Sequence, residues 1–304
     1  MMTTLRNKFY IIISLFGLTM FFSCEDAIDV ELAEVDAQFV VDAWLHDMDD
    51  RIPEVRIGLS QPFVDSSFQE SLENAIVTIT NGDNTTYSLV YSSISQSYQL
   101  TSEDLLLWRE EPIGQTFALN IDIDGVMLTA QNEKLRVPEI DSILQELRTD
   151  DPFVDDGIFC NFFATDLEGV GDTYWVRTFK NGDYLNKPAE INITFDAGFS
   201  PGGEVDNLVF IQPIQELNNP VDENFAPIPY LPGDSIRVEL HSISNSAFFF
   251  MEVLRDQLLN SSNGIFAEPL ANTNGNISSS DGTEVLGFFN VSSVSIIEEE
   301  ILEQ

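Results

Sequence analysis

Residues 75–91, AIVTITNGDNTTYSLVY, decide the fold class of this chain. Polar and apolar residues alternate over residues 75–80 and again over 86–91, with Asn81-Gly82-Asp83 between the two runs. Alternation with a period of two places every second side chain on the same face of a strand. Asn-Gly favours a tight turn because both residues adopt positive φ at little cost. The stretch therefore predicts a β-hairpin that buries one face.

Further strands are predicted around this hairpin. Strand composition recurs in residues 38–45, 55–60, 117–123 and 126–130. The last two runs flank Asp124-Gly125, which predicts a second hairpin turn. Short strands at this spacing are typical of β-sandwiches. We therefore expect a mainly β fold that begins with an immunoglobulin-like or transthyretin-like β-sandwich over residues 37–137.

The second part of the chain, residues 138–304, is predicted to form another β-rich domain with one helix. Period-two patterns occur at residues 173–179, 191–195 and 235–240. Six Pro fall within residues 198–234, so regular structure there should be sparse. Asn245 or Ser246 can cap a helix whose apolar pattern runs to Leu258. Residues 139–148 fit either a helix or a strand.

The N-terminus has the pattern of a bacterial lipoprotein signal peptide. Arg6 and Lys8 precede an apolar run over residues 9–22, which leads into Ser23-Cys24. This run is too short to cross a bilayer at about 1.5 Å per residue. A small residue before Cys resembles a lipobox, in which the Cys sulfur takes a diacylglyceryl group and the peptide is cut before it. We expect a signal peptide at residues 1–23 and lipidation of Cys24; the alternative is an ordinary secretory peptide with a chance Cys.

The chain is strongly acidic, with 13 Lys and Arg against 51 Asp and Glu. Loss of Arg6 and Lys8 with the signal peptide would change the net charge from −38 to −40. Such a charge disfavours binding to nucleic acid or to anionic lipid and suits a solvated surface outside the cytoplasm. Residues 24–36 are themselves acidic, and we expect them to form a tether between the lipid and the folded part.

Few residues indicate catalysis, and no catalytic residue, cofactor site or metal site is predicted. His46 and His241 stand in no metal-ligand spacing, and the sequence has no nucleophile elbow and no phosphate-binding glycine loop. We expect His241 to be a partly exposed residue at a strand end. Cys160 lies among apolar residues, which indicates a buried structural thiol that forms no disulfide once Cys24 carries lipid.

Two acidic loops and one turn were candidates for calcium. Asp124-Gly125 could belong to an EF-hand loop that starts at Asn120, but Gln131 stands where a bidentate Glu is needed. A hairpin turn is therefore expected there. The acidic loops contain Asp47, Asp49 and Asp50 in one case and Asp150, Asp151, Asp155 and Asp156 in the other. Either could hold calcium loosely, whereas solvated loops are the simpler expectation.

The lipobox is followed by an ordered set of motifs: residues 39–45 (FVVDAWL), 74–79 (NAIVTI), 137–143 (VPEIDSI), 232–238 (PGDSIRV), 269–272 (PLAN), 275–277 (GNI) and 286–289 (LGFF). This set resembles the DUF4249 lipoproteins of Bacteroidota. The resemblance supplies no catalytic residues. It implies a role in uptake, because members of the family are often encoded beside TonB-dependent receptors of the outer membrane. Glu25, Asp26 and Asp29 loosely resemble the signal that sends lipoproteins of this group to the cell surface, so surface exposure is favoured over a periplasmic orientation.

These observations predict a non-enzymatic lipoprotein of the outer membrane. We expect it to act as an accessory or ligand-binding partner of a TonB-dependent transporter, with outer-membrane lipid and that receptor as its partners. The alternative is a surface adhesion or structural lipoprotein that works without a transporter. A secreted hydrolase would need a pair of convergent acids or a metal site, which the sequence by itself does not reveal.

Overall fold

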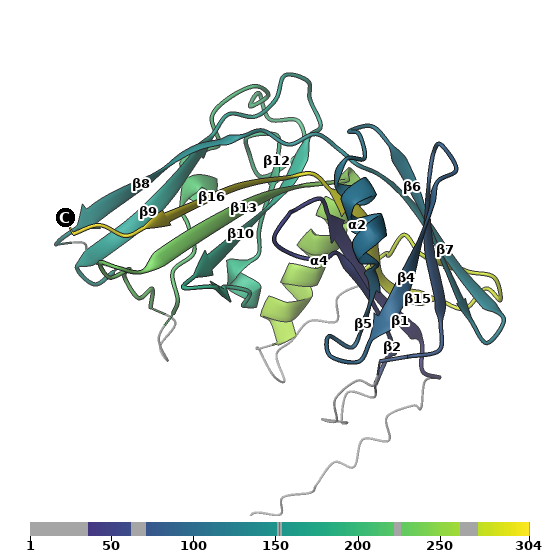
Figure 1. Cartoon of the computed structure of the whole chain (residues 1–304). Helices are drawn as coiled ribbons and strands as arrows, with labels where there is room; N and C mark the ends of the chain where they lie inside the picture. The colour runs from purple at the N-terminus through teal and green to yellow at the C-terminus, as the bar shows by residue number, and fades with distance from the viewer. Residues whose placement is uncertain are drawn as a thin grey trace, which may run out of the picture. The chain divides into compact units, whose positions relative to one another are not determined.

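Strands are the main regular structure of the described chain, as the alternating sequence patterns predict (Figure 1). The computed structural model describes residues 36–61, 71–150, 152, 154–221, 226–261 and 273–303. The signal peptide, Cys24 and the tether up to residue 35 lie outside these ranges, so lipidation stays a prediction. The PLAN motif at residues 269–272 lies outside them too.

The larger sheet has nine strands in the order β14-β7-β6-β3-β4-β5-β2-β1-β15. Their bounds along the chain are β1 Phe39–His46, β2 Glu54–Leu59, β3 Ile76–Asn81, β4 Thr86–Ser92, β5 Ser97–Leu100, β6 Thr116–Ile123, β7 Val126–Glu133, β14 Ser278–Ser279 and β15 Val285–Ser292. Side chains from both ends of this order, such as Val41 and Leu128, meet in one apolar cluster. The sheet thus folds over a shared core, and the prediction of a mainly β fold with a sandwich is confirmed.

Both predicted hairpins form. In β3 and β4, Val77 pairs with Leu89 and Ile79 with Tyr87, and these four side chains are buried. In the second hairpin, Ile123 pairs with Val126 across a two-residue turn. Asp124 and Gly125 have φ of 51° and 88°, the positive values that this kind of turn requires. This geometry excludes the helix-flanked EF-hand loop.

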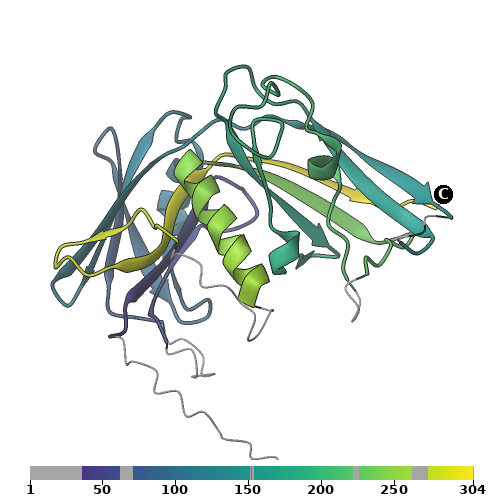
Figure 2. The same ribbon diagram turned by 180° about the vertical axis from the view of Figure 1, so that it is seen from behind.

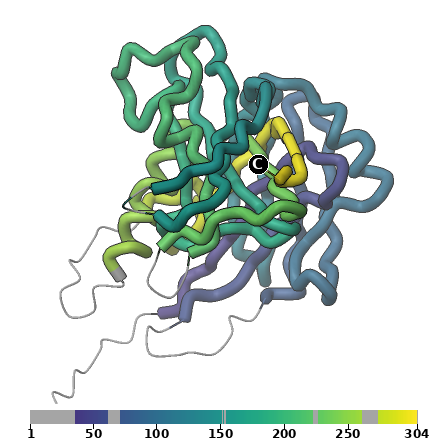
Figure 3. The backbone as a smooth tube through the Cα atoms, turned by 90° about the vertical axis from the view of Figure 1, so that its left-hand side faces the viewer, coloured from purple at the N-terminus to yellow at the C-terminus, as the bar shows by residue number. Residues whose placement is uncertain are grey.

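A strand from the far end of the chain completes the first sheet. β15 pairs in parallel with β1 from Phe39↔Val285 to His46↔Ser292, and the two strands lie side by side in Figure 1. Figure 3 views the molecule from the side on which the C-terminus lies. At Gly287 (φ +104°) a Cβ would lie 1.9 Å from the carbonyl oxygen of Val41, so only glycine permits this approach. A division at residue 137 stays a prediction: residues 37–304 form one compact unit, and β14 and β15 belong to the first sheet.

The second sheet comes from the later part of the chain. It contains, in spatial order, β11 (Asp183–Tyr184), β10 (Thr173–Lys180), β13 (Ser235–Ile243) and β16 (Val294–Glu300), with β12 (Asn192–Phe195) also paired to β10. β8 (Ile140–Arg148) and β9 (Gly157–Ala164) pair with each other. Residues 139–148, which fitted either element, therefore form a strand. Cys160 is buried in β9 as predicted, and burial raises the pKa of its thiol to about 12.

Helix α4 (Asn245–Ser261) is the helix expected near residue 245. The hydroxyl of Ser244, rather than Asn245 or Ser246, caps it by accepting a hydrogen bond from the Ala247 amide at 3.2 Å. Its apolar face packs on β12 and β10 and also reaches β15 (Figure 2). The other helices within the described ranges are short: α2 (Ser102–Arg109), α3 (Gln212–Gln215) and the 3-10 helix η1 (Pro188–Glu190). Within the described part of residues 198–234, α3 is the sole helix, so the Pro-rich prediction is confirmed.

Within the ranges that the structure describes, no helix combines the length and apolar character needed to cross a membrane.

Candidate functional site

A cleft of about 700 Å³ lies where the outer face of β1 and β2 meets one face of the second sheet. Its lining includes Asp42, Trp44, His46, Asp50, Arg51, Glu54, Arg56, Trp175, Arg177 and Tyr184. A volume of this size suits a small organic molecule, since ligand sites commonly measure about 300–1,000 Å³. We call this site the arginine cleft.

Strand alternation explains how β1 serves both the core and the cleft. Val41, Ala43 and Leu45 are buried in the apolar core of the first sheet. Trp44 and His46 stand at the alternate positions, and both line the cleft. The Trp44 ring meets the Trp175 ring edge-on at 5.5 Å between centroids, which joins the two sheets at this end of the cleft.

The facing wall belongs to the second sheet, where Trp175 and Arg177 of β10 line the cleft and a row of side chains on β13 lies next to them. The antiparallel register places Trp175 opposite His241, Arg177 opposite Glu239 and Phe179 opposite Arg237. These residues are spaced by two along each strand, so they share one face of the sheet. An aromatic row that includes Arg177 thus lies beside a row of charged and polar side chains on β13.

Glu239 is the charged centre of this wall and is fully buried. Arg51 forms an ion pair with its Oε1, Arg237 Nε lies 2.8 Å from the same atom, and Arg177 Nη1 lies 3.8 Å from Oε2. Burial by itself would raise the pKa of the carboxyl. The hydrogen bond from His241 and the positive charges of the arginines outweigh burial, so the pKa of Glu239 is held well below its ordinary value.

The two histidines are buried beside this carboxylate. His241 Nε2 lies 3.1 Å from Glu239 Oε2, and the ring is only 4% exposed, so the expectation of a partly exposed strand-end residue was wrong. The strand continues to Ile243, which keeps His241 inside the sheet. Burial, together with the charges of neighbouring arginines, lowers the pKa of His46 to about 3 and that of His241 to about 4. Both rings are therefore neutral near pH 7.

Arg177 is held by aromatic rings. Its guanidinium carbon lies 4.3 Å from the ring centroid of Tyr184, 4.9 Å from that of Trp175 and 5.4 Å from that of Phe179. Arg177 Nε and Trp175 Nε1 are buried without a hydrogen-bond partner among the described residues, as is His46 Nδ1. Cation–π contacts of this kind fix the orientation of a guanidinium.

The acidic loop after β1 closes the cleft through ion pairs. Arg51 reaches Glu239 and stacks over Phe179 at 5.1 Å, while Asp50 pairs with Arg237 at 2.6 Å. The other two acids of the loop are also paired: Asp47 lies 3.0 Å from Lys134 Nζ and Asp49 lies 3.4 Å from Arg109 Nε. Each of these three carboxylates therefore has a cationic partner.

In the part of the chain that the structure describes, no group of three or more His, Cys, Asp or Glu could hold a metal ion. Asp151, from the second acidic loop, lies outside those residues. Asp156 accepts a hydrogen bond from the Asp150 amide at 2.9 Å, which is an ordinary loop contact.

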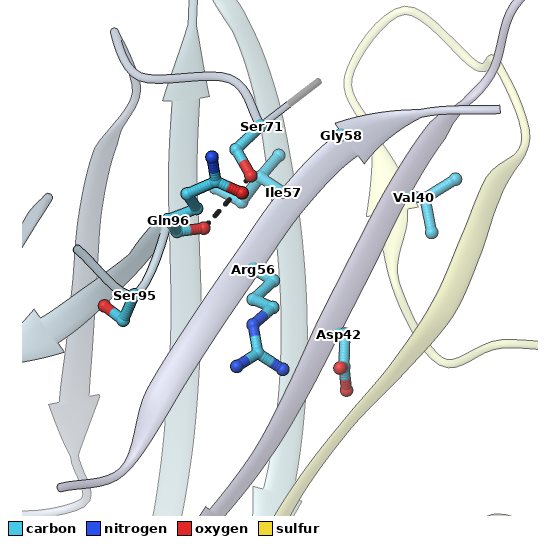
Figure 4. A pocket seen from close by; sticks show the side chains of 8 residues that line it. All are labelled: Val40, Asp42, Arg56, Ile57, Gly58, Ser71, Ser95 and Gln96. Atoms are coloured by element: carbon cyan, nitrogen blue, oxygen red, sulfur yellow. Dashed lines mark hydrogen bonds between the residues drawn. The ribbon is translucent and has the colours of Figure 1, made fainter. Parts of the chain in front are cut away.

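A smaller hollow of about 230 Å³ adjoins the arginine cleft and shares Asp42 and Arg56 with it (Figure 4). Asp42 on β1 and Arg56 on β2 stand opposite each other in the sheet. On the far side, Ser71 Oγ donates to the backbone carbonyl of Gln96 at 3.0 Å. The hollow is small and holds no buried ionic cluster among its lining residues, so the arginine cleft is the stronger candidate site.

The sequence showed the alternating residues of the cleft strands, but it did not show that these strands lie next to one another. Trp175, Arg177 and Phe179 alternate within one predicted strand, and Arg237 and Glu239 lie in another, directly before His241. Charge is the sequence feature that could have indicated this site. The chain has only 13 Lys and Arg at a net charge of −38, and four of them belong to the site: Arg51, Arg56, Arg177 and Arg237. Which strands pair, and which loop reaches them, is decided by the fold.

Comparison with known proteins gives a family but no activity. A family model described as a domain of unknown function, DUF4249, matches residues 25–297. No curated protein matches the chain. The matched range covers nearly all of both sheets and the whole arginine cleft. The chain therefore belongs to the DUF4249 family.

Proposed function

We propose that this protein is a lipid-anchored, non-enzymatic accessory of a TonB-dependent transporter, and that it holds a ligand in the arginine cleft. The observation that carries the proposal is the cleft itself: about 700 Å³ of space lined by aromatic rings and by arginines fixed in place. Fixed side chains of this kind favour binding because little side-chain freedom is lost when the ligand arrives.

The chemistry of the lining, and of the ionic cluster beside it, supports binding rather than catalysis. His46 and His241 have pKa values of about 3 and 4, too low for efficient proton transfer near pH 7. Glu239 is engaged by three arginines and a histidine, which leaves it little capacity as a base. The described lining of the cleft contains no Ser, Thr or Cys that could serve as a nucleophile.

The membrane part of the proposal rests on the N-terminal sequence. Arg6, Lys8 and the apolar residues 9–22 before Ser23-Cys24 favour a lipoprotein signal. The resemblance to lipoproteins encoded beside TonB-dependent receptors supports such a receptor as the proposed partner. An acidic tether over residues 24–36 would let the folded part reach a barrel beside its lipid, and a surface-exposed orientation is favoured.

Purification from native outer membranes tests the proposal. The tagged full-length protein, extracted in mild detergent after cross-linking, is expected to bring down one large outer-membrane barrel in near-stoichiometric amount. Deletion of the gene should reduce growth on the compound that this barrel imports while the barrel still assembles. Repeated recovery of the lipoprotein alone would overturn the proposal and favour the adhesion or structural role.

A further inference from the structure

The arginine cleft contains hydrogen-bond donors that nothing in the described chain uses. Arg177 Nε and Trp175 Nε1 are buried and have no acceptor among the described residues. Native proteins leave few buried polar groups unpaired, and those that remain call for a partner. Arg and Trp side chains only donate, so the missing partner must be an acceptor.

Arg177 also has positive charge that its neighbours do not fully neutralise. Its nearest carboxylate oxygen, on Glu239, is 3.8 Å away, whereas Arg237 approaches the same carboxylate to 2.8 Å and His241 to 3.1 Å. Arg51 pairs with it as well. The negative charge of Glu239 is therefore neutralised mainly by these other partners, and less by Arg177. A guanidinium with spare N–H groups is suited to a carboxylate, which it can bind with two parallel hydrogen bonds.

Apolar surface lies next to this cation. Trp44 and Trp175 are both partly exposed, and their rings meet at 5.5 Å, where they line the cleft together. The cleft volume of about 700 Å³ is far more than a bare inorganic anion needs. The space fits a molecule with an apolar body as well as a charged group.

The charges of the lining do not favour a cation in this position. Arg51, Arg56 and Arg177 are balanced by Asp42, Asp50 and Glu54, in a chain whose net charge is −38. Glu54 is paired with Arg56, and Asp50 with Arg237. A cation would therefore find its best sites elsewhere on the acidic surface, whereas an anion finds its least repulsive region here.

We infer that the arginine cleft binds an organic carboxylate, whose carboxylate group meets Arg177 and whose apolar body lies against Trp44 and Trp175. This inference rests on the proposed function and adds the chemical class of the ligand. It requires no bond to form or break, in keeping with a site that holds its ligand for transfer.

The test compares two probes that differ in charge but hardly in shape, 4-phenylbutyrate and 4-phenylbutyramide. Each is titrated into the purified full-length protein at neutral pH, with tryptophan fluorescence and calorimetry as readouts. Two of the three Trp line the cleft, so binding should change the emission. The carboxylate should bind saturably with a Kd below about 1 mM, and about tenfold to a hundredfold more tightly than the amide.

Variants locate the binding. Arg177→Gln should weaken phenylbutyrate binding by about tenfold or more, and Arg177→Lys should restore only part of it because the fork of donors is lost. Arg148→Gln is the matched control. Arg148 also stacks on an aromatic ring, Phe159 at 4.8 Å, and pairs with a carboxylate, Glu216 at 2.6 Å, but it lies outside the cleft. Circular dichroism checks that each variant is folded.

Three results would overturn the inference: no saturable binding of phenylbutyrate, equal affinity for the acid and the amide, or an equal loss in Arg148→Gln and Arg177→Gln. The comparison of acid with amide uses the unaltered protein, so it tests the inference even if Arg177→Gln fails to fold. The binding assay needs no transporter. Failure here with a barrel recovered by purification would reject only the ligand class, whereas carboxylate binding without a barrel would reject only the transporter.

Discussion

Arg51, in the loop that follows β1, forms an ion pair with Glu239 in the middle of β13, 188 residues away in the sequence. The carboxylate is fully buried, while the Arg51 side chain is 35% exposed. The Arg51 side chain thus reaches from the loop after β1 to a buried carboxylate in the second sheet. This contact closes one side of the arginine cleft and makes Glu239 important for stability.

We expect Glu239→Gln to destabilise the protein by about 2–4 kcal/mol, because it leaves several arginines without their buried counter-charge. Their partial exposure limits the loss. Glu146→Gln is the control: Glu146 is 54% exposed and pairs with Arg148 at 3.4 Å, so its loss should cost at most about 1 kcal/mol. Urea unfolding followed by circular dichroism measures both. Equal small effects would show that the cluster contributes little.

Stability should fall as the pH is lowered from 6.5. The pKa values of His46 and His241, about 3 and 4 in the folded chain, lie below the ordinary 6.5, so the unfolded chain binds more protons between these values. Each His should cost about 2 kcal/mol at about pH 5 relative to about pH 8. The lowered pKa of Glu239 acts in the same direction, but only below its ordinary 4.5. Between about pH 5 and about pH 8, the change of stability with pH therefore measures the effect of the two histidines.

Removal of one histidine should reduce that slope by about half. His241→Asn suits this purpose because its amide can still donate toward Glu239. Thermal melts at a series of pH values give the measurement. A slope that is unchanged in both His241→Asn and His46→Leu would mean that other groups govern the acid sensitivity.

Gly287→Ala should prevent normal pairing of β15 with β1. A Cβ at Gly287 would lie 1.9 Å from the Val41 carbonyl oxygen, and the backbone has φ +104°. We expect a loss of more than about 3 kcal/mol, from strain and from the displaced strand. At Gly182 the φ is +86° but a Cβ would meet nothing within 4 Å, so Gly182→Ala should cost about 1 kcal/mol, from strain alone. Thermal unfolding of the two variants separates steric clash from strain.

Cys24→Ala should abolish lipidation. The predicted lipobox ends in this Cys, and without its sulfur no diacylglyceryl group can be attached. Labelling with an alkyne fatty acid should mark the natural protein and leave the variant unlabelled and uncleaved. Cys160→Ala is the control, since that thiol is buried in β9 and should not affect labelling. Undiminished label on Cys24→Ala would refute the lipoprotein assignment.

The sequence by itself determined the local structure. Alternation over residues 75–91 and the turn residues between the runs were enough for the first hairpin, because side-chain period and turn chemistry act over a few residues. Asp124-Gly125 decided the second turn in the same way. The helix at α4 and the sparse structure around the six Pro also follow from local signals. The apolar pattern of residues 139–148 fits both the helical period of 3.6 and the strand period of 2, so the strand at this position is determined by packing against other elements.

Only the tertiary structure decided which distant segments meet. No local pattern states that β15 pairs with β1, or that Arg51 reaches Glu239 across 188 residues. The strands of the cleft wall were predicted, yet their register was not, and it is the register that sets Arg177 beside Glu239 and Trp175 beside His241. His241 looked like a strand-end residue because its burial depends on neighbours contributed by other strands. Long-range pairing depends on the sum of many weak contacts over the whole chain, which a short stretch of sequence does not contain.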